Sequence, residues 1–323
     1  MSPTGPAGPI SPTGPAGPTS PTGPANPTGP TNPTGPGRSP SPLQPLADER
    51  LSAAGVRLLL KRDDLLHPSV PGNKWRKLMP NLAEARAAGL DAVLTFGGAY
   101  SNHLRATAAA GQEAGLRTIG VVRGDELADR PLNPSLAQAS AWGMELDFMD
   151  RARWRRRMSA EVLAELQDRH GPALVVPEGG SNAAGVRGCL PLGRELAESE
   201  AELVCVSVGT GGTLAGLAAG LTPHQQAIGY AALGHAPLTG ETAALQLAAF
   251  GRHTGNWRID TGHTFGGYGR STPELRAFAD DFRARHGISL DLSYEAKALH
   301  GVFAGLRDGT FRRGTTVAMV LAG

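Results

Sequence analysis

The sequence has 323 residues, which is enough for one or two domains with a sizeable hydrophobic core. Its 31 lysines and arginines nearly balance its 29 aspartates and glutamates, so its charge gives no reason to expect a nucleic acid or an anionic membrane as a partner. No apolar run approaches the length that spans a bilayer, and the N-terminus lacks the charged and apolar regions of a secretory signal, so we expect neither a membrane segment nor secretion.

Residues 1–42 differ in composition from the rest of the chain. The pattern Pro-Thr-Gly-Pro-Ala begins at Pro3 and recurs at Pro12 and Pro21, but glycine does not fall at every third position, which argues against a collagen helix. Nearly every apolar residue here is proline or alanine, so the segment cannot build a core. We predict a disordered, partly polyproline-II tail.

From Leu43 onward, short β-rich runs alternate with helical stretches. This alternation predicts an α/β fold with parallel sheets flanked by helices, in which ligands bind at the carboxyl ends of the strands. A helix is predicted over residues 159–170, ending before Gly171, and another is indicated by the helical spacing of Leu275, Phe278, Ala279 and Phe282. The predicted strands are Ala92–Phe96, Thr118–Val122, Leu146–Met149, Ala173–Val176, Leu203–Val208, Ala227–Ala231 and Thr316–Val320.

Two local features have simple interpretations. The run from Arg151 to Arg157 holds five arginines around Trp154, and we interpret it as a solvated helix start in preference to a binding patch. Cys189 and Cys205 lie among apolar or small residues, and two cysteines make no disulfide framework, so a reducing cytoplasm is expected.

The loop Pro71–Leu78 reads PGNKWRKL. Asn73 is predicted to cap a helix that begins with Lys74. The positive end of a helix disfavours an ammonium group, which lowers the pKa of a lysine and suits an amine that must act as a nucleophile. Taken alone, this loop favours an ordinary lysine that faces solvent, since most lysines are exposed.

Two further loops follow strands and contain paired glycines. In residues 95–104, TFGGAYSNHL, a strand ends, two glycines turn the chain and Ser101-Asn102 begins a helix. The free N–H groups at that helix start could hold a substrate carboxylate, although a plain N-cap by Ser101 is an equal alternative. Residues 177–182, PEGGSN, repeat the order of strand, glycines and polar cap.

In the loop Val206–Leu214, a buried strand leads into glycines and then into a helix of small residues. Such a loop lets backbone N–H groups approach a phosphate, and Thr210 and Thr213 can add hydroxyl donors. A dinucleotide site would require an acidic residue at the end of the next strand, where the chain reads AAL at 231–233, and the lysine of a Walker loop is absent. A tight turn without a ligand remains the other alternative.

Several motifs occur together and in a fixed order: GNKWRKL, FGGAYSNHLRA, PEGGSNAAG, VGTGGTLAG, FGGYGRSTPEL and LSYEAKALHG. In this combination the sequence resembles the pyridoxal 5′-phosphate (PLP) dependent family of 1-aminocyclopropane-1-carboxylate (ACC) deaminase and D-cysteine desulfhydrase, which has fold type II, similar to the tryptophan synthase β subunit. The resemblance covers nearly all of Leu43–Gly323. It implies PLP as cofactor, a small amino acid as substrate and a homodimer.

The resemblance also implies which residues bind the cofactor. Lys74 would carry PLP as a Schiff base and later shuttle protons. Asn102 would hydrogen-bond the 3′-oxygen of the pyridine ring. Glu295 would face the pyridine nitrogen and keep the ring protonated, which makes it a full electron sink. The phosphate would be held by Gly209, Thr210, Gly211, Gly212 and Thr213.

For the substrate, the resemblance places Ser101, Asn102 and His103 around the carboxylate, and Tyr268 and Tyr294 near the reacting atoms. Ser101 and the two tyrosines are therefore catalytic candidates beside the lysine. His103 is typical of desulfhydrase-like members, whereas a tyrosine at 294 followed by glutamate is typical of ACC deaminases, so the substrate stays open.

The chain departs from the family pattern in two places. Relatives usually end the last strand with His-Thr-Gly-Gly, whereas the matching stretch here is Val320–Gly323, with the sequence VLAG. Relatives also often have Asp-Pro-Val-Tyr where Asp291–Tyr294 reads DLSY. We expect a cofactor-binding large domain of residues 43–77 and 190–323, and a small domain of residues 78–189.

Three functions follow from these features. The first is deamination of a small amino acid by ring opening or β-elimination, with release of ammonia and a 2-oxo acid. The second is β-replacement or dehydration of a serine- or threonine-like substrate. The third is a weakly active PLP-binding protein, since a fold does not by itself establish an activity.

Overall fold

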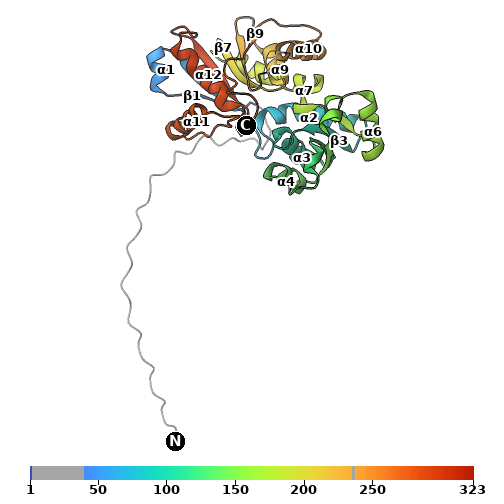
Figure 1. Ribbon diagram of the computed structural model, residues 1–323. Helices are drawn as coiled ribbons and strands as arrows, with labels where there is room; N and C mark the ends of the chain where they lie inside the picture. Colours follow the sequence, from blue (N-terminus) through green and yellow to red (C-terminus); the bar gives the residue numbers. More distant parts are fainter. Residues whose placement is uncertain (2–39, 235–236) are drawn as a thin grey trace. The chain divides into compact units, whose positions relative to one another are not determined.

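The computed structural model describes residues 1, 40–234 and 237–323. The predicted disorder of the N-terminal tail therefore falls almost wholly outside the described residues. The described residues from 40 onward belong to one compact unit. Within them, the strands form one sheet of six strands and another of four, and Figure 1 shows each sheet with its own helices.

The larger sheet has the strand order β1-β2-β10-β7-β8-β9. Its neighbours run parallel, except that β1 pairs antiparallel with β2 at the edge. All six residues of β10 are buried, as expected for an apolar strand inside a parallel sheet. The strands are β1 (Leu43–Leu46), β2 (Arg57–Arg62), β7 (Leu203–Val208), β8 (Gln226–Ala231), β9 (Trp257–Asp260) and β10 (Thr316–Leu321).

The smaller sheet has the order β5-β4-β3-β6, and all its described pairs are parallel. Its strands are β3 (Ala92–Gly97), β4 (Arg117–Arg123), β5 (Met144–Met149) and β6 (Leu174–Val176). The prediction of an α/β fold with mainly parallel sheets flanked by helices is confirmed. The strands of this sheet come from within residues 78–189, and the division of the chain into two domains at the expected boundaries remains a prediction.

The helices end where local signals predict. Ser159 caps the helix α6, which stops before Gly171, and Leu275, Ala279 and Phe282 are buried on one face of α11. None of the described helices is long and apolar enough to cross a membrane. The helices are α1 (Glu49–Ala54), α2 (Gly72–Ala87), α3 (Asn102–Ala114), α4 (Pro134–Ala141), α5 (Arg151–Arg155), α6 (Ala160–His170), α7 (Ala183–Gly188), α8 (Leu190–Ala197), α9 (Gly212–Gly220), α10 (Leu238–Phe250), α11 (Pro273–His286) and α12 (Glu295–Arg307). Short 3-10 turns occur at η1 (Asp63–Leu65), η2 (Asp125–Leu127) and η3 (Glu178–Gly180).

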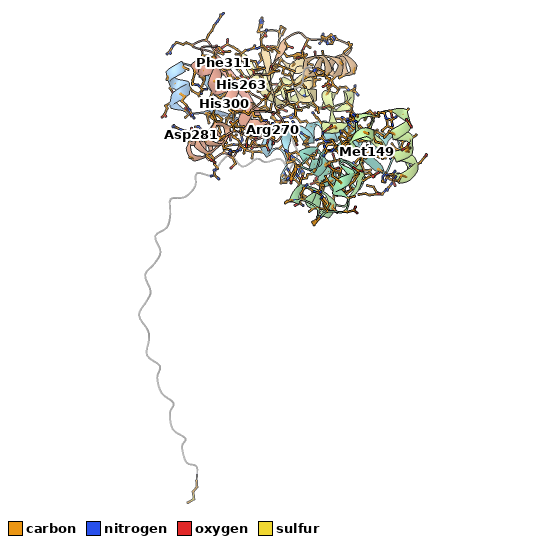
Figure 2. All side chains as sticks on the ribbon, viewed as in Figure 1. Met149, His263, Arg270, Asp281, His300 and Phe311 are labelled. Atoms are coloured by element: carbon orange, nitrogen blue, oxygen red, sulfur yellow. The ribbon has the colours of Figure 1, made fainter. Side chains whose placement is uncertain are left out.

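Each sheet has its own hydrophobic core. Phe311 packs in the core between the larger sheet, α1 and α12, whereas Met149 packs with Trp154 beside the smaller sheet. The two labelled side chains lie in separate parts of the molecule in Figure 2. Each sheet is fixed by its own core, so the loops that follow its strands start from rigid positions.

Candidate functional site

A cavity of about 380 Å³ lies where the carboxyl ends of β3 and β7 meet the first turns of α2, α9 and α12. Loops far apart in the sequence thus converge on one place, as expected at the carboxyl ends of parallel strands. Gly212 is the first residue of α9, between two residues that line the cavity. The other predicted site residues all line it: Lys74, Ser101, Asn102, His103, Gly209, Thr210, Gly211, Thr213, Tyr268, Tyr294 and Glu295.

The amine of Lys74 has the properties of a nucleophile. Its Nζ donates a hydrogen bond of 2.9 Å to Oδ1 of Asn73, which carries no charge. Burial, together with the charge of nearby Lys77, lowers the pKa of Lys74 to about 7. A large fraction of this amine is therefore neutral near pH 7, and only the neutral amine can attack a carbonyl carbon.

The predicted N-cap at Asn73 is wrong. Helix α2 begins two residues earlier than predicted, at Gly72 with Pro71 at the N-cap, and Gly72 approaches so closely that an added Cβ would lie 2.5 Å from the carbonyl oxygen of Asp63. The side chain of Asn73 is thereby free for another purpose. Its Nδ2 donates to Oγ1 of Thr213 at 3.3 Å, which links the lysine to the start of α9.

The loop before α9 is shaped by glycine. Gly211 has a φ of 82°, and an added Cβ would lie 2.1 Å from Oγ1 of Thr242, so no other residue fits without a shift. At Gly209, an added Cβ would lie 3.0 Å from the ring of Tyr294. The first N–H groups of α9 have no acceptor within the helix, so they are suited to binding an anion.

Lys77 is a site residue that the sequence reasoning missed. It is buried one helical turn after Lys74, and its Nζ donates to the carbonyl of Gly179 and to Oγ of Ser181, each at 3.1 Å. An added Cβ at Gly212 would lie 3.2 Å from this Nζ, so the amine adjoins the start of α9. Burial lowers the pKa of Lys77, which favours a ligand anion that would compensate its charge. The spacing of three residues from Lys74 was the available signal.

The loop after β3 behaves partly as predicted. Ser101 caps α3 by accepting a hydrogen bond from the backbone N–H of Leu104 at 3.3 Å. Oδ1 of Asn102 accepts from Nη2 of Arg105 at 2.6 Å, which leaves the amide nitrogen of Asn102 as a donor. Ser101 therefore caps the helix, while Asn102 next to it keeps donors that can bind a ligand.

His103 is a buried and neutral imidazole. The hydroxyl of Thr95 donates to the carbonyl of Val176 at 2.8 Å, so it accepts from Nε2 of His103, also at 2.8 Å. Nδ1 is then an acceptor, and it is buried without a hydrogen-bond partner among the described residues. Burial, followed by the charges of Lys74 and Lys77, holds the pKa of His103 well below its usual value.

Glu295 and the two tyrosines line the cavity with α3 and α9. Oε1 of Glu295 accepts from the backbone N–H of Gly323 at 2.7 Å, and burial raises the pKa of its carboxyl group to about 7. The rings of Tyr268 and Tyr294 meet edge to face, with centroids 5.9 Å apart. Burial raises the pKa of both phenols, so both remain protonated.

The site thus combines the Lys74 amine with its lowered pKa, a glycine loop suited to a phosphate, and the carboxyl group of Glu295 at the start of α12. Comparison with known proteins identifies the group that such a site binds. Residues 35–323 match the family described as pyridoxal-phosphate dependent enzyme. The chain belongs to this family. It is an enzyme whose cofactor is PLP.

Named relatives and one solved structure support the membership. A Pyrococcus horikoshii protein with the provisional name 1-aminocyclopropane-1-carboxylate deaminase is 31% identical over 79% of this chain and 81% of its own length. A D-cysteine desulfhydrase of Klebsiella pneumoniae is 29% identical over 85% of this chain and 88% of its own length. The crystal structure of an ACC deaminase homologue has a TM-score of 0.77 at 28% identity, covering 89% of this chain and 90% of that chain. The chain therefore has fold type II of the PLP enzymes, as the sequence predicted.

The cavity fits PLP on its own chemistry. Gly211, which has a positive φ and no room for a Cβ, lies at the start of α9. There the backbone N–H donors of the helix start adjoin the buried ammonium group of Lys77, and together they suit a phosphate. Lys74 supplies the amine that an aldehyde requires. The individual roles of the predicted site residues remain predictions.

Proposed function

We propose that this enzyme deaminates a small amino acid, by ring opening of ACC or by β-elimination from D-cysteine, and releases ammonia and a 2-oxo acid. The observation that carries the proposal is the Lys74 amine, with a pKa of about 7, in the same cavity as the glycine loop and Glu295. Relatives that cover about four fifths of the chain are named for both reactions. Ring opening would make the enzyme a C–N hydrolase, and elimination would make it a lyase.

We assign the cofactor contacts as follows. Lys74 would hold PLP covalently through its aldehyde carbon. The backbone N–H groups of residues 209–213 and the ammonium group of Lys77 would hold the phosphate. The free amide nitrogen of Asn102 would donate to the 3′-oxygen, and Glu295 would lie at the pyridine nitrogen.

When bound, PLP draws electrons away from the α-carbon of the amino acid. The chain's own groups would then manage protons. Lys74, with its pKa near 7, can accept the α-proton of D-cysteine and return it at another carbon. Glu295 would keep a proton at the pyridine nitrogen, since a carboxylate favours the charged form of a neighbouring base.

The substrate groups follow from the same geometry. Ser101, Asn102 and His103 would position the substrate carboxylate at the start of α3, where helix N–H groups favour an anion. ACC has no α-proton, so its ring opening needs another acid, base or nucleophile. Because burial keeps the phenols of Tyr268 and Tyr294 protonated, they are better suited to donate a proton than to remove one.

Release of 2-oxo acid from ACC, D-cysteine, L-cysteine, D-serine and L-serine tests the proposal. We expect turnover of ACC or D-cysteine, and its loss in Lys74→Ala. Turnover that requires a second, nucleophilic substrate would replace deamination by β-replacement. If no amino acid released ammonia, the protein would be a PLP-binding protein with little activity.

We also propose that the enzyme is a homodimer in the cytoplasm. Cys189 and Cys205 are both buried free thiols, which suits a reducing compartment. The family resemblance is the basis for the homodimer. Light scattering of the purified enzyme tests it, and a monomeric mass would contradict it.

A further inference from the structure

Two arginines from different elements share one aromatic platform beside the cavity. Trp154 is buried in the core of the smaller sheet, where its ring meets that of Phe96 edge to face. The guanidinium carbon of Arg157 lies 4.8 Å from the centroid of the Trp154 ring, and that of Arg123 lies 5.9 Å away. Both arginines line the cavity. Stacking on a buried ring restricts the motion of both side chains, so their charges are held at the cavity wall.

The charges of this pair are only partly compensated. Arg157 donates from Nη1 to the carbonyl of Trp154 and from Nη2 to Glu178, each at 3.1 Å, while its Nε is buried without a hydrogen-bond partner in the part of the chain that the structure describes. For Arg123, no hydrogen bond or ion pair with any described residue is found. Two guanidinium groups therefore face one carboxylate at this wall.

The other arginines of the 151–157 run behave as the sequence interpretation predicts. None of them lines the cavity. Arg155 is exposed to solvent. Three others pair with glutamates at the surface, namely Arg151 with Glu126, Arg153 with Glu165 and Arg156 with Glu161. The interpretation as a solvated helix start therefore holds for these four and not for Arg157.

The arginine pair lies near the proposed substrate position. An added Cβ at Gly98 would lie 3.7 Å from Nη2 of Arg123, so this guanidinium adjoins the loop that leads to Ser101. Tyr268, which we place near the reacting atoms, lines the same cavity. A substrate whose carboxylate lies at the start of α3 could therefore direct its side chain toward Arg123 and Arg157.

We propose that Arg123 and Arg157 form a subsite for an anionic group on the substrate's side chain. The preferred substrates would then be amino acids that carry an oxyanion, such as a phosphate or a sulfonate, on the β-carbon. A guanidinium pair matches the oxygens of such a group through several charge-assisted hydrogen bonds, whereas a neutral thiol or hydrocarbon ring leaves Arg123 without a counterion. This inference rests on the proposed function, because it assigns the substrate class of the same site.

The reaction balances with water as the second reactant. Lys74 would take the α-proton, and the electron pair of that C–H bond forms a double bond between the α- and β-carbons. The bond between the β-carbon and the anionic group breaks, and its electron pair leaves with that group. The remaining fragment takes up water and becomes pyruvate and ammonium. O-Phosphoserine would thus give pyruvate, ammonium and phosphate, and 3-sulfoalanine would give pyruvate, ammonium and sulfite.

Matched substrates test the subsite by kinetics on the holoenzyme. O-Phosphoserine is compared with serine and 3-sulfoalanine with cysteine, each as both enantiomers, in wild type, Arg123→Gln, Arg157→Gln and the control Arg155→Gln. We expect wild type to have the lower KM for the anionic member of at least one pair. Removal of either cavity arginine should raise that KM by roughly 10- to 100-fold and change the KM for the neutral member by less than about 3-fold. The control variant should match wild type, because its arginine lies outside the cavity.

A binding measurement separates this inference from the proposed function. Succinate and butanoate have four carbons each and differ by one carboxylate, so calorimetry with both on the holoenzyme reports the second anion without turnover. We expect succinate to bind more tightly, and the preference to disappear in Arg123→Gln. If no amino acid is turned over, the proposed function fails, while the succinate preference still decides the subsite. Equal binding of both acids, or an equal rise of KM for neutral and anionic substrates in the variants, would overturn it.

Discussion

Nζ of Lys74 donates a hydrogen bond of 2.9 Å to Oδ1 of Asn73, its neighbour in the chain. Nδ2 of the same asparagine donates to Thr213 at the start of α9, so one amide joins the reactive amine to the proposed phosphate loop. A neutral partner leaves the charge of the lysine uncompensated. Burial, and after it the charge of Lys77, lowers the pKa of Lys74 to about 7, and the uncharged amide of Asn73 does not oppose that shift.

Asn73→Asp should make Lys74 a poorer nucleophile. A carboxylate at hydrogen-bonding distance favours the ammonium form and raises a lysine pKa, by about 1–3 units. We expect the cofactor-free variant to take up PLP at least roughly 10-fold more slowly at pH 7, with the wild-type rate approached at higher pH. Stopped-flow absorbance across pH measures this, and a pH profile identical to that of wild type would refute the role given to the amide.

Gly211→Ala should weaken PLP binding strongly. The substitution places a methyl group against Thr242 at a residue whose φ is 82°, so the loop must move. The matched control is Gly240→Ala, since Gly240 lies in α10 with no atom within 4 Å of an added Cβ. Equilibrium titration with PLP compares the two. Equal affinities would mean that the loop is only a turn.

Glu295→Gln should stabilise the cofactor-free protein at neutral pH. Burial raises the carboxyl pKa from 4.5 to about 7, so between these values the unfolded state ionises first and the native state loses stability as the pH rises. The loss approaches roughly 3 kcal/mol above pH 7 and vanishes below pH 4.5. Glutamine keeps an acceptor for Gly323 without the charge. We therefore expect the variant's advantage in unfolding free energy, measured with urea, to grow from pH 5 to pH 8, and an advantage independent of pH would contradict the assignment.

Ser41 should mark where the folded chain begins. Its hydroxyl donates to Asp63 and its carbonyl accepts from buried Lys61, each at 2.6 Å. A chain that starts at Leu43 loses both bonds, whereas one that starts at Pro40 keeps them. Because hydrogen bonds to charged groups contribute about 1.5–3 kcal/mol each, the shorter chain should melt roughly 5–10 °C lower. Calorimetry of the two chains decides, and equal melting temperatures would show that these bonds contribute nothing.

Much of the fold could be predicted from apolar runs, but strands that carry charge could not. The charged residues Lys61 and Arg62 hide the apolar pattern by which β2 would be predicted as a strand. Their burial depends on ion pairs with Glu195 and Asp64, which belong to other elements. Strand β1 contains Pro45, which is tolerated only because the strand lies at the sheet edge. Such partners are set by the tertiary structure, which single-strand patterns do not contain.

The site could be predicted mainly from the order of its loops. Each glycine loop alone left a tight turn or a plain cap as an alternative, and their convergence on one cavity depends on the sheet topology. For Lys77 the three-residue spacing from Lys74 was only a weak signal, because most lysines are exposed. Arg157 lies in a run of surface arginines, and nothing in the local sequence distinguishes it from them. The predicted start of α2 was two residues too late, because Pro71 is the N-cap and Gly72 is already helical.

The central claim is that Lys74 holds the cofactor, and reduction of the PLP-bound enzyme with borohydride followed by peptide mapping tests it most directly. Reduction fixes PLP onto the amine that carries it. We expect one labelled peptide, with the label on Lys74, and none in Lys74→Ala. A label on Lys77 or Lys297 in the wild-type enzyme would contradict the account.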